Sequence, residues 1–516
     1  MSKALFKSTS VVVAMTMISR VFGFIRDMVT AHLFGAGELS DAFLVAFRIP
    51  NFMRRLFAEG SFSQAFVPVL SEYQKNKTTA EIKAFVNAIA GTLGAILLLV
   101  TFVGIISAPC IIKLFAPGFS VDGERYNLAV QMLLITFPYL MLISLTAFSG
   151  AILNTYSKFW VAAFTPVFLN ISMIACAIWL APRLQVSITA LAWGVLIAGI
   201  VQFLFQIPFL KKLDLLPKPR LDFKDKGVAR VLKLMVPALF GVSVSQVNLL
   251  LDTLFASLLM VGSVSWLYFS DRLMEFPLGV FGVAISTVIL PHLSRHHATQ
   301  SKQDFSQTLD WAMRCVLFVG LPSGVVFALI SGPLLSTLLQ YGHFDAESVF
   351  MAKKSLSAFA IGIVPFMMIK VLAAGFYARQ NTKFPVRIGI IAMLANMIFN
   401  VILIWPLAHM GIALATSLAA ILNMSLLYVG LCRRGIYSPR KGWRQFFMRI
   451  GFANLLLGLW LWLACGDIHD WVIQTAKWRM QHLLILLVVG VLFYFLGLLI
   501  SGFKIKDILM PDTQVN

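Results

Sequence analysis

Long apolar runs recur from one end of the 516-residue chain to the other. A helix needs about 20 apolar residues to cross a bilayer, whereas a tilted β-strand needs about 10. The run lengths therefore predict an all-α polytopic membrane protein with about 14 transmembrane helices, rather than a barrel. The predicted spans are 8–34, 39–71, 84–110, 128–153, 159–181, 187–210, 231–260, 264–294, 307–331, 350–376, 384–406, 410–432, 446–466 and 480–502.

Composition supports this class. Hydrophobic residues make up 59% of the chain and charged residues only 12%, against about 25% charged in a typical soluble protein. The net charge of +20 does not indicate nucleic-acid binding, because the basic residues cluster in short loops between spans. The five cysteines lack metal-binding or redox spacing and are interpreted as packing residues; they are Cys110, Cys176, Cys315, Cys432 and Cys465.

The loop charges predict the orientation of the spans. One set of alternate loops is rich in lysine and arginine, above all the linker 211–230, and the opposite set is poor in them. Basic loops stay on the cytoplasmic side of a membrane. Both termini are therefore expected in the cytoplasm, as an even number of spans also requires. No cleavage site follows Lys3 and Lys7, so the first span is expected to be an uncleaved insertion signal.

The chain repeats itself at a spacing of about 224 residues. SAP at 107–109 matches SGP at 331–333, and Pro68 in FVPVLS matches Pro291 in ILPHLS. Six spans per repeat predict two parallel six-helix lobes with a binding site between them near mid-membrane. The expected domains are an N-lobe (1–210), a basic cytoplasmic linker (211–230), a C-lobe (231–434) and a C-terminal helix pair (435–516).

Arginines inside the spans are the most informative residues. A lone arginine at the bilayer centre costs roughly 2.5 to 3.5 kcal/mol on insertion scales. Several in neighbouring helices therefore predict a water-filled cationic cavity, which would bind an anion. The planar guanidinium favours phosphate or pyrophosphate. The arginines in question are Arg20, Arg26, Arg48, Arg54, Arg55 and Arg272.

Carboxylates accompany these arginines. Arg20 and Asp27 are seven residues apart and share a helical stripe, whereas Arg26 lies well round the helix. Asp41, Arg48 and Arg55 also repeat at seven, although Pro50 is expected to kink that helix. In the eighth span, Asp271 and Glu275 flank Arg272. We expect Asp27, Asp41, Arg55, Asp271 and Glu275 to form a charge network that orients and neutralises the binding arginines.

Two other interpretations of the arginines remain open. They could form an internal salt-bridge network that only holds the lobes together. Arg48 and one of Arg54 and Arg55 could instead extend to the lipid headgroups.

A second polar group is a weaker candidate for a cation site. Asp252, Asn396, Asn400 and Thr416 lie within spans of the second lobe and offer oxygen ligands. A polar contact between helices is the favoured explanation for them. The sequence has no nucleotide-binding, metal-binding or nucleophile motif, which predicts a transporter without its own ATPase and not an enzyme.

Several motifs resemble the MurJ (MviN) family of lipid II flippases, within the multidrug/oligosaccharidyl-lipid/polysaccharide exporter superfamily. They are SRVFGFIRD (19–27), FGAG (34–37), NFMRRLFAEGSFSQAFVPVLSEY (51–73), GAILNT (150–155), GVSVSQ (241–246) and DRLMEFPLGV (271–280). The resemblance extends over essentially the whole chain. It implies fourteen helices, with a C-terminal pair that forms a groove for a lipid tail.

The resemblance also implies the function and its residues. The substrate would be lipid II, which is undecaprenyl-pyrophosphate carrying a disaccharide-pentapeptide, moved from the cytoplasmic to the periplasmic leaflet for peptidoglycan synthesis. The family's functional residues fall on Arg20, Arg26, Asp41, Arg54 and Arg272. The seven-residue spacing alone would have selected Arg55 over Arg54. The implied location is the bacterial inner membrane, with other cell-wall synthesis proteins as candidate partners.

The expected mechanism is alternating access, in which Arg20, Arg26, Arg54 and Arg272 clamp the pyrophosphate between the lobes. No cofactor is expected; Na⁺ or the membrane potential are the candidate energy sources. Two rival functions remain open at this stage. One is a flippase for another polyprenyl-linked oligosaccharide, and the other is a cation-coupled drug exporter, which would be expected to line its cavity with carboxylates.

Overall fold

The computed structural model describes residues 3–56, 62–121, 123–440 and 442–504. All regular structure within these ranges is helical. Nine helices in the described ranges are long and apolar enough to cross a membrane. The chain is therefore an all-helical, multi-pass protein, as the apolar runs predicted.

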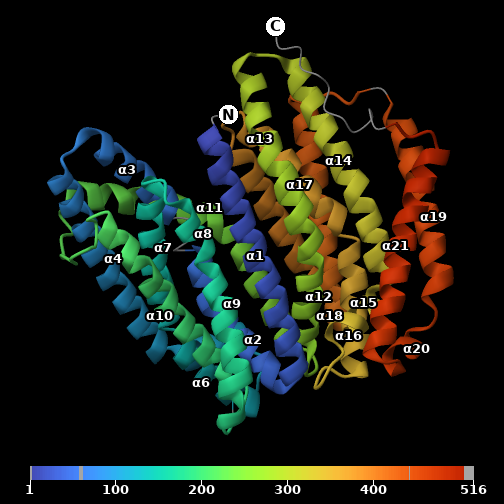
Figure 1. Cartoon of the computed structure of the whole chain (residues 1–516), viewed down its shortest axis with the longest axis horizontal. Helices are drawn as coiled ribbons and strands as arrows, with labels where there is room; N and C mark the ends of the chain where they lie inside the picture. Colours follow the sequence, from blue (N-terminus) through green and yellow to red (C-terminus); the bar gives the residue numbers. More distant parts are fainter. Residues whose placement is uncertain (1–2, 57–61, 122, 441, 505–516) are drawn as a thin grey trace. The chain divides into compact units, whose positions relative to one another are not determined.

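The chain divides into two compact units, residues 1–265 and 266–516. Figure 1 traces the first unit from blue to green and the second from green to red. The helices that lie within unit 1 are α1 (Lys3–Phe34), α2 (Glu38–Met53), α3 (Ser63–Asn76), α4 (Thr79–Ile106), α5 (Ala108–Phe115), α6 (Glu124–Thr136), α7 (Tyr139–Thr155), α8 (Phe159–Phe164), α9 (Pro166–Ala175), the π-helical turn η2 (Cys176–Leu180), the 3₁₀ turn η3 (Ala181–Arg183), α10 (Thr189–Lys212) and α11 (Lys226–Ser257).

Unit 2 begins within α12 and ends with the C-terminal helices. Its elements are α12 (Ser263–Pro277), the π-helical turn η4 (Leu278–Gly282), α13 (Val283–Ala298), α14 (Lys302–Leu329), α15 (Ser331–Leu339), α16 (Ala346–Ala360), α17 (Ile363–Tyr377), α18 (Lys383–Arg433), α19 (Trp443–Cys465), α20 (Ile468–Ile473) and α21 (Ala476–Ile500).

Helix α11 packs within unit 1, although the sequence repeat assigned most of it to the second lobe. It contacts α2, α3, α4 and α5. An ion pair of 2.8 Å between Arg230 and Glu72 ties its start to α3. The division into compact units therefore falls about one helix later than the expected boundary between lobes, which was drawn from topology rather than from packing.

The helix boundaries repeat at the spacing found in the sequence. Helices α3 and α13 contain the matching prolines Pro68 and Pro291, which are 223 positions apart. Helices α4 and α14 both have 28 residues and begin at Thr79 and Lys302, again 223 positions apart. The duplication is thus present in the local structure as well as in the Pro and Gly positions.

Helix α18 contains two of the predicted spans, 384–406 and 410–432. Its helical geometry breaks at Ala408, which has φ 49° and ψ −131°. A positive φ is uncommon for a residue with a side chain and interrupts the helix here. Beyond the break, a Cβ on Gly411 would lie 2.2 Å from the carbonyl oxygen of Leu403, so only glycine allows this close return.

Two helices that carry predicted site residues, α2 and α12, are interrupted at their ends. Pro50 lies near the end of α2, after which residues 54–56 continue as a π-helical turn. Residues 57–61 of the predicted span 39–71 lie outside the described ranges, and α3 completes it. Pro277 ends α12, and η4 then joins it to α13. A proline thus lies at or near the end of each α-helical segment, and proline is a common site of helix kinks.

The C-terminal pair packs onto unit 2 through a polar anchor. Helices α19 and α21 contact each other, and α14 contacts α19. The buried carboxylate of Asp310 on α14 accepts hydrogen bonds from the Tyr437 hydroxyl at 2.7 Å and the Trp443 indole at 2.6 Å. Arg314 pairs with the same carboxylate at 3.0 Å. This cluster fixes the start of α19 against α14.

Candidate arginine site

Arg26 is held in a buried polar cluster on α1. Its guanidinium donates to the Asp27 carboxylate through Nε at 3.0 Å and Nη2 at 2.7 Å. Its Nη1 donates to the amide oxygen of Asn170 on α9 at 3.0 Å. Arg26 is 7% exposed and Asp27 is 5% exposed. The carboxylate supplies the opposite charge that makes a buried guanidinium tolerable.

The pairing differs from the one that the helical stripe suggested. Arg20 and Asp27 were placed on one stripe, but the structure pairs Asp27 with its neighbour Arg26 and leaves Arg20 exposed. A helical wheel gives only the direction in which each Cβ atom leaves the helix. The long arginine side chain can reach back across the helix surface to the adjacent carboxylate.

Arg48 and Arg54 come from the end of α2 and from the π-helical turn that follows it. Arg54 donates from Nη2 and Nε to the side-chain oxygen of Asn51, at 2.7 and 3.1 Å. Arg48 donates from Nε to the Thr253 hydroxyl on α11 at 2.8 Å. Arg55 is half-buried in the same π-helical turn as Arg54. The change from α- to π-helical geometry rotates successive side chains, which is why a seven-residue spacing does not describe this segment.

The Asp41 carboxylate accepts hydrogen bonds from two backbone amides and one serine hydroxyl rather than from an arginine. Its Oδ2 accepts from the Gly262 amide at 2.7 Å. Its Oδ1 accepts from the Ser265 amide at 2.9 Å and the Ser265 hydroxyl at 2.6 Å. A carboxylate at these positions caps the first turn of α12 and interacts favourably with its dipole. Asp41 thereby fixes the start of the helix that carries Arg272.

Arg272 lies in a more open environment in unit 2. Its Nη1 donates to Glu275 at 2.7 Å, one turn along α12, where the two side chains are 27% and 45% exposed. Its guanidinium also lies over the Tyr268 ring, 5.0 Å from the centroid. Glu275 and Tyr268 are three and four residues away and so share a helix face with Arg272. Asp271 is half-buried on the same helix.

The four residues of the candidate cation site belong to different units: Asp252 to unit 1, and Asn396, Asn400 and Thr416 to unit 2. Asp252 lies on α11 in unit 1, and the Asn248 amide approaches its carboxylate at 3.5 Å. Asn396 and Asn400 are buried on α18 in unit 2, and Thr416 donates to the Ile412 carbonyl at 3.0 Å. No cluster of three or more His, Cys, Asp and Glu side chains that could hold a metal occurs in the described ranges.

The sequence interpretation missed the neutral partners of the arginines. Asn170, Asn51 and Thr253 all take part in the contacts above. A usable signal existed for Asn170, because an isolated amide in a long apolar span has to be satisfied inside the protein. Asn51 stands three residues before Arg54, a spacing that brings side chains together on a helix.

Comparison with known proteins agrees with this geometry. The family model for the lipid II flippase MurJ matches residues 30–481. A probable lipid II flippase MurJ from Haemophilus influenzae is 47% identical over 511 residues, covering 96% of this chain and all of the relative. The lipid II flippase MurJ of Burkholderia cenocepacia is 42% identical over 507 residues, covering 97% of this chain and 98% of the relative.

Solved structures give the same result for the fold. A lipid II flippase MurJ in an inward closed conformation matches with a TM-score of 0.79 and 29% identity, covering 94% of this chain and 97% of that one. An inward-facing multidrug transporter of the MATE family matches with a TM-score of 0.68 at 15% identity, covering 83% and 97%, and so shares the fold alone. The chain belongs to the lipid II flippase MurJ family, and it is accordingly a multi-pass transporter of the bacterial inner membrane rather than an enzyme.

Proposed function

We propose that Arg20, Arg26, Arg54 and Arg272 bind the pyrophosphate of lipid II while this flippase moves it to the periplasmic leaflet for peptidoglycan synthesis. The observation that carries the proposal is the burial of Arg26 on α1, where its guanidinium is held by Asp27 and Asn170. Membership of the lipid II flippase family supports the choice of substrate.

The guanidinium groups suit this task chemically. Each presents a planar set of donors that matches phosphate oxygens in pairs. The Asp27 carboxylate neutralises the charge of the buried Arg26 guanidinium, so the pyrophosphate has to compete with Asp27 for Arg26. Glu275 has the same role for the more exposed Arg272. When a phosphate replaces the carboxylate as the partner of an arginine, the guanidinium keeps a negative partner throughout. The site can therefore take up the pyrophosphate without leaving an arginine uncompensated.

We expect the cycle to follow alternating access, with the arginines reached from one side of the membrane and then from the other. Outward movement of an anion is favoured by a cytoplasm-negative potential, by about 2.3 kcal/mol per charge per 100 mV. Na⁺ bound through Asp252, Asn396, Asn400 and Thr416 is a second candidate for the energy source. Other cell-wall synthesis proteins are the expected partners.

The predicted topology has fourteen spans and two cytoplasmic termini, with the polyprenyl tail in a groove of the C-terminal pair. Exposed apolar side chains on α19 and α21 support lipid contact there, including Trp462 at 69% and Leu499 at 74%. These two helices also fall outside the repeated part of the chain, so they are free to serve a purpose that the duplicated body does not.

Two single substitutions test the arginine site. Arg272→Ala and Arg26→Ala are each expected to abolish the appearance of lipid II at the outer face in cells that depend on this protein. Lipid II at the outer face is measured by its accessibility to an externally added probe, and protein level by immunoblot. Arg379→Ala removes an exposed arginine outside the site and is the matched control. Full activity of either variant at normal protein level would refute the proposed binding role of that arginine.

A depletion experiment tests the substrate. Loss of the protein is expected to cause lipid II to accumulate, because its transport is blocked before the precursor is used. Accumulation of a different polyprenyl-linked oligosaccharide would show that this chain serves another pathway.

A further inference from the structure

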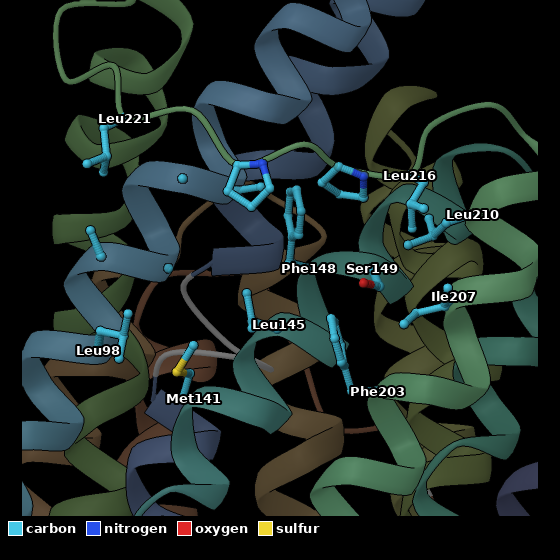
Figure 2. Close-up of a pocket in the computed structure, with 16 residues that line it drawn as sticks. Leu98, Met141, Leu145, Phe148, Ser149, Phe203, Ile207, Leu210, Leu216 and Leu221 are labelled. Carbon is cyan, nitrogen blue, oxygen red and sulfur yellow. The ribbon is translucent and has the colours of Figure 1, made fainter.

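Unit 1 contains an apolar pocket of about 470 Å³ that is separate from the arginine cluster. Figure 2 shows side chains from α4, α7 and α10 around it, with the segment after α10 crossing its end. Leu98, Leu145 and Phe203 represent the three helices, and Leu216 and Leu221 come from the crossing segment. Its volume lies within the range of about 300 to 1,000 Å³ that is usual for ligand sites.

The pocket lies beside the surface that faces lipid. Leu98, which lines it, is 57% exposed, and its neighbours Leu99 and Phe102 on α4 are 64% and 63% exposed. On α10, Leu204 next to Phe203 is 54% exposed. Large apolar side chains at this exposure in a membrane span contact acyl chains. The pocket is therefore within reach of a lipid chain from the bilayer.

The crossing segment, residues 214–224, is an ordered strap rather than a loose linker. The Lys218 amide donates to the Asn87 side chain at 2.7 Å, and the Arg220 amide donates to the Asn87 carbonyl at 3.0 Å. Lys83 forms an ion pair with Asp214. Gly91 lets the strap lie directly on α4, because a Cβ there would be 2.2 Å from the Arg220 carbonyl oxygen.

The strap places positive charge at the end of the pocket. Lys218 and Arg220 are exposed, and within the described ranges no ion pair involves either side chain. The nearby carboxylates are engaged: Asp214 pairs with Lys83, and Asp222 accepts the amides of Lys224 and Asp225. Exposed Leu221, at 65%, and Phe223, at 57%, alternate with these cations. Basic and apolar residues interleaved in this way are typical of segments at a membrane surface.

We propose that this pocket binds one anionic glycerophospholipid, with an acyl chain among α4, α7 and α10 and the phosphate on Lys218 and Arg220. Apolar contact alone would not select a ligand, because the surrounding bilayer is equally apolar. Selectivity has to come from the headgroup, and each Lys or Arg near an anionic lipid contributes about 1 kcal/mol. Two cations predict a preference of about fivefold per cation for an anionic over a neutral lipid.

The test uses the full chain, purified in mild detergent and examined by native mass spectrometry. Phosphatidylglycerol and phosphatidylcholine with identical acyl chains are titrated separately, and a polyprenyl monophosphate serves as a third probe. Gly94→Leu is designed to fill the pocket, since Gly94 lines it and a Cβ there meets no atom within 4 Å. Leu99→Phe adds bulk on the lipid face of the same helix outside the pocket and is its matched control.

Two further variants separate charge from the position of the strap. Lys218→Ala with Arg220→Ala removes both cations and is expected to lower the preference for phosphatidylglycerol by more than tenfold. Gly91→Ala keeps the cations but displaces the strap from α4, and is expected to lower the preference as well. Lys302→Ala removes an exposed lysine from the start of α14 in unit 2 and should leave it unchanged.

We expect Gly94→Leu to weaken the binding of both phospholipids and the strap variants to weaken only phosphatidylglycerol. Unchanged lipid binding by Gly94→Leu, or equal binding of the two phospholipids by the unaltered protein, would overturn the proposal. If Gly94→Leu weakens the binding of the polyprenyl monophosphate more than that of phosphatidylglycerol, the occupant of the pocket is an isoprenoid carrier instead. If Gly94→Leu lowers the melting temperature, Ala95→Leu at the adjoining pocket position decides the question.

Discussion

Arg26 in unit 1 and Arg272 in unit 2 have opposite surroundings, although both lie in predicted spans and both pair with a carboxylate. Arg26 is 7% exposed and donates to Asp27 and Asn170. The Arg272 side chain is 27% exposed, and its partner Glu275 is 45% exposed. One guanidinium is fixed by the protein interior, and the other is held by contacts that solvent weakens.

The difference separates structural from binding effects. A buried ion pair costs several kcal/mol to break, because the remaining charge stays in a poorly solvated place. A half-exposed pair on one helix contributes only a few tenths of a kcal/mol. Substitutions near Arg26 should therefore change both folding and transport, whereas those near Arg272 should change transport almost alone.

The largest effect is expected for Asp27→Ala. Removal of the carboxylate leaves Arg26 buried without its countercharge, which costs about 3 to 5 kcal/mol. The variant should melt at a lower temperature in detergent, as measured by loss of monodisperse protein on heating. The double variant Arg26→Leu with Asp27→Leu should regain much of this stability but remain inactive. A single variant as stable as the unaltered protein would show that Arg26 does not depend on Asp27.

The helical class, the repeat and the presence of charged residues in the interior could be predicted from the sequence alone. Run lengths, Pro and Gly positions and the cost of a buried arginine are all local properties of the chain. The partner of each arginine was less predictable. Arg26 pairs with the adjacent Asp27, and Arg54 with Asn51, since side-chain length and a π-helical turn decide these contacts. Asn170 comes from a helix more than 140 positions away, so only the packing of α9 on α1 reveals it.

A second, smaller effect is expected for Asn170→Ala, which removes the neutral partner of Arg26. Hydrogen bonds to charged groups contribute about 1.5 to 3 kcal/mol. If Asn170 orients the guanidinium for the pyrophosphate, lipid II binding should weaken by about tenfold or more while the Asp27 pair preserves the fold. Binding is measured by titration of the purified protein with lipid II.

Asn170→Asp is the informative companion to that variant. It keeps the oxygen that accepts from Arg26 but adds a negative charge, which competes with the pyrophosphate. Binding should therefore be weaker than in Asn170→Ala, although the hydrogen bond is retained. Both variants also lose the amide group that donates to the Ser19 carbonyl at 3.1 Å, so their melting temperatures are measured alongside binding. Tighter binding by Asn170→Asp than by Asn170→Ala would contradict the competing-charge explanation.

A third prediction concerns the shape of the cation at position 272. Arg272→Lys keeps the charge but replaces the planar fork with a single ammonium. We expect lipid II binding to fall by roughly tenfold, which corresponds to about 1.4 kcal/mol, with no change in melting temperature. Equal affinity of the two proteins would show that charge alone, and not paired hydrogen bonding, is used on the unit 2 side.

The smallest effect is expected for Glu275→Gln. Loss of a half-exposed pair with Arg272 should change the free energy of unfolding by less than about 0.5 kcal/mol. The substitution also removes the carboxylate that competes with the pyrophosphate for Arg272, so lipid II binding should become slightly tighter rather than weaker. The sign of the change in affinity, measured by the same titration, is the decisive observation. Weaker binding would mean that Glu275 positions Arg272 for the substrate, and the contrast with the buried Arg26 pair would then be one of degree only.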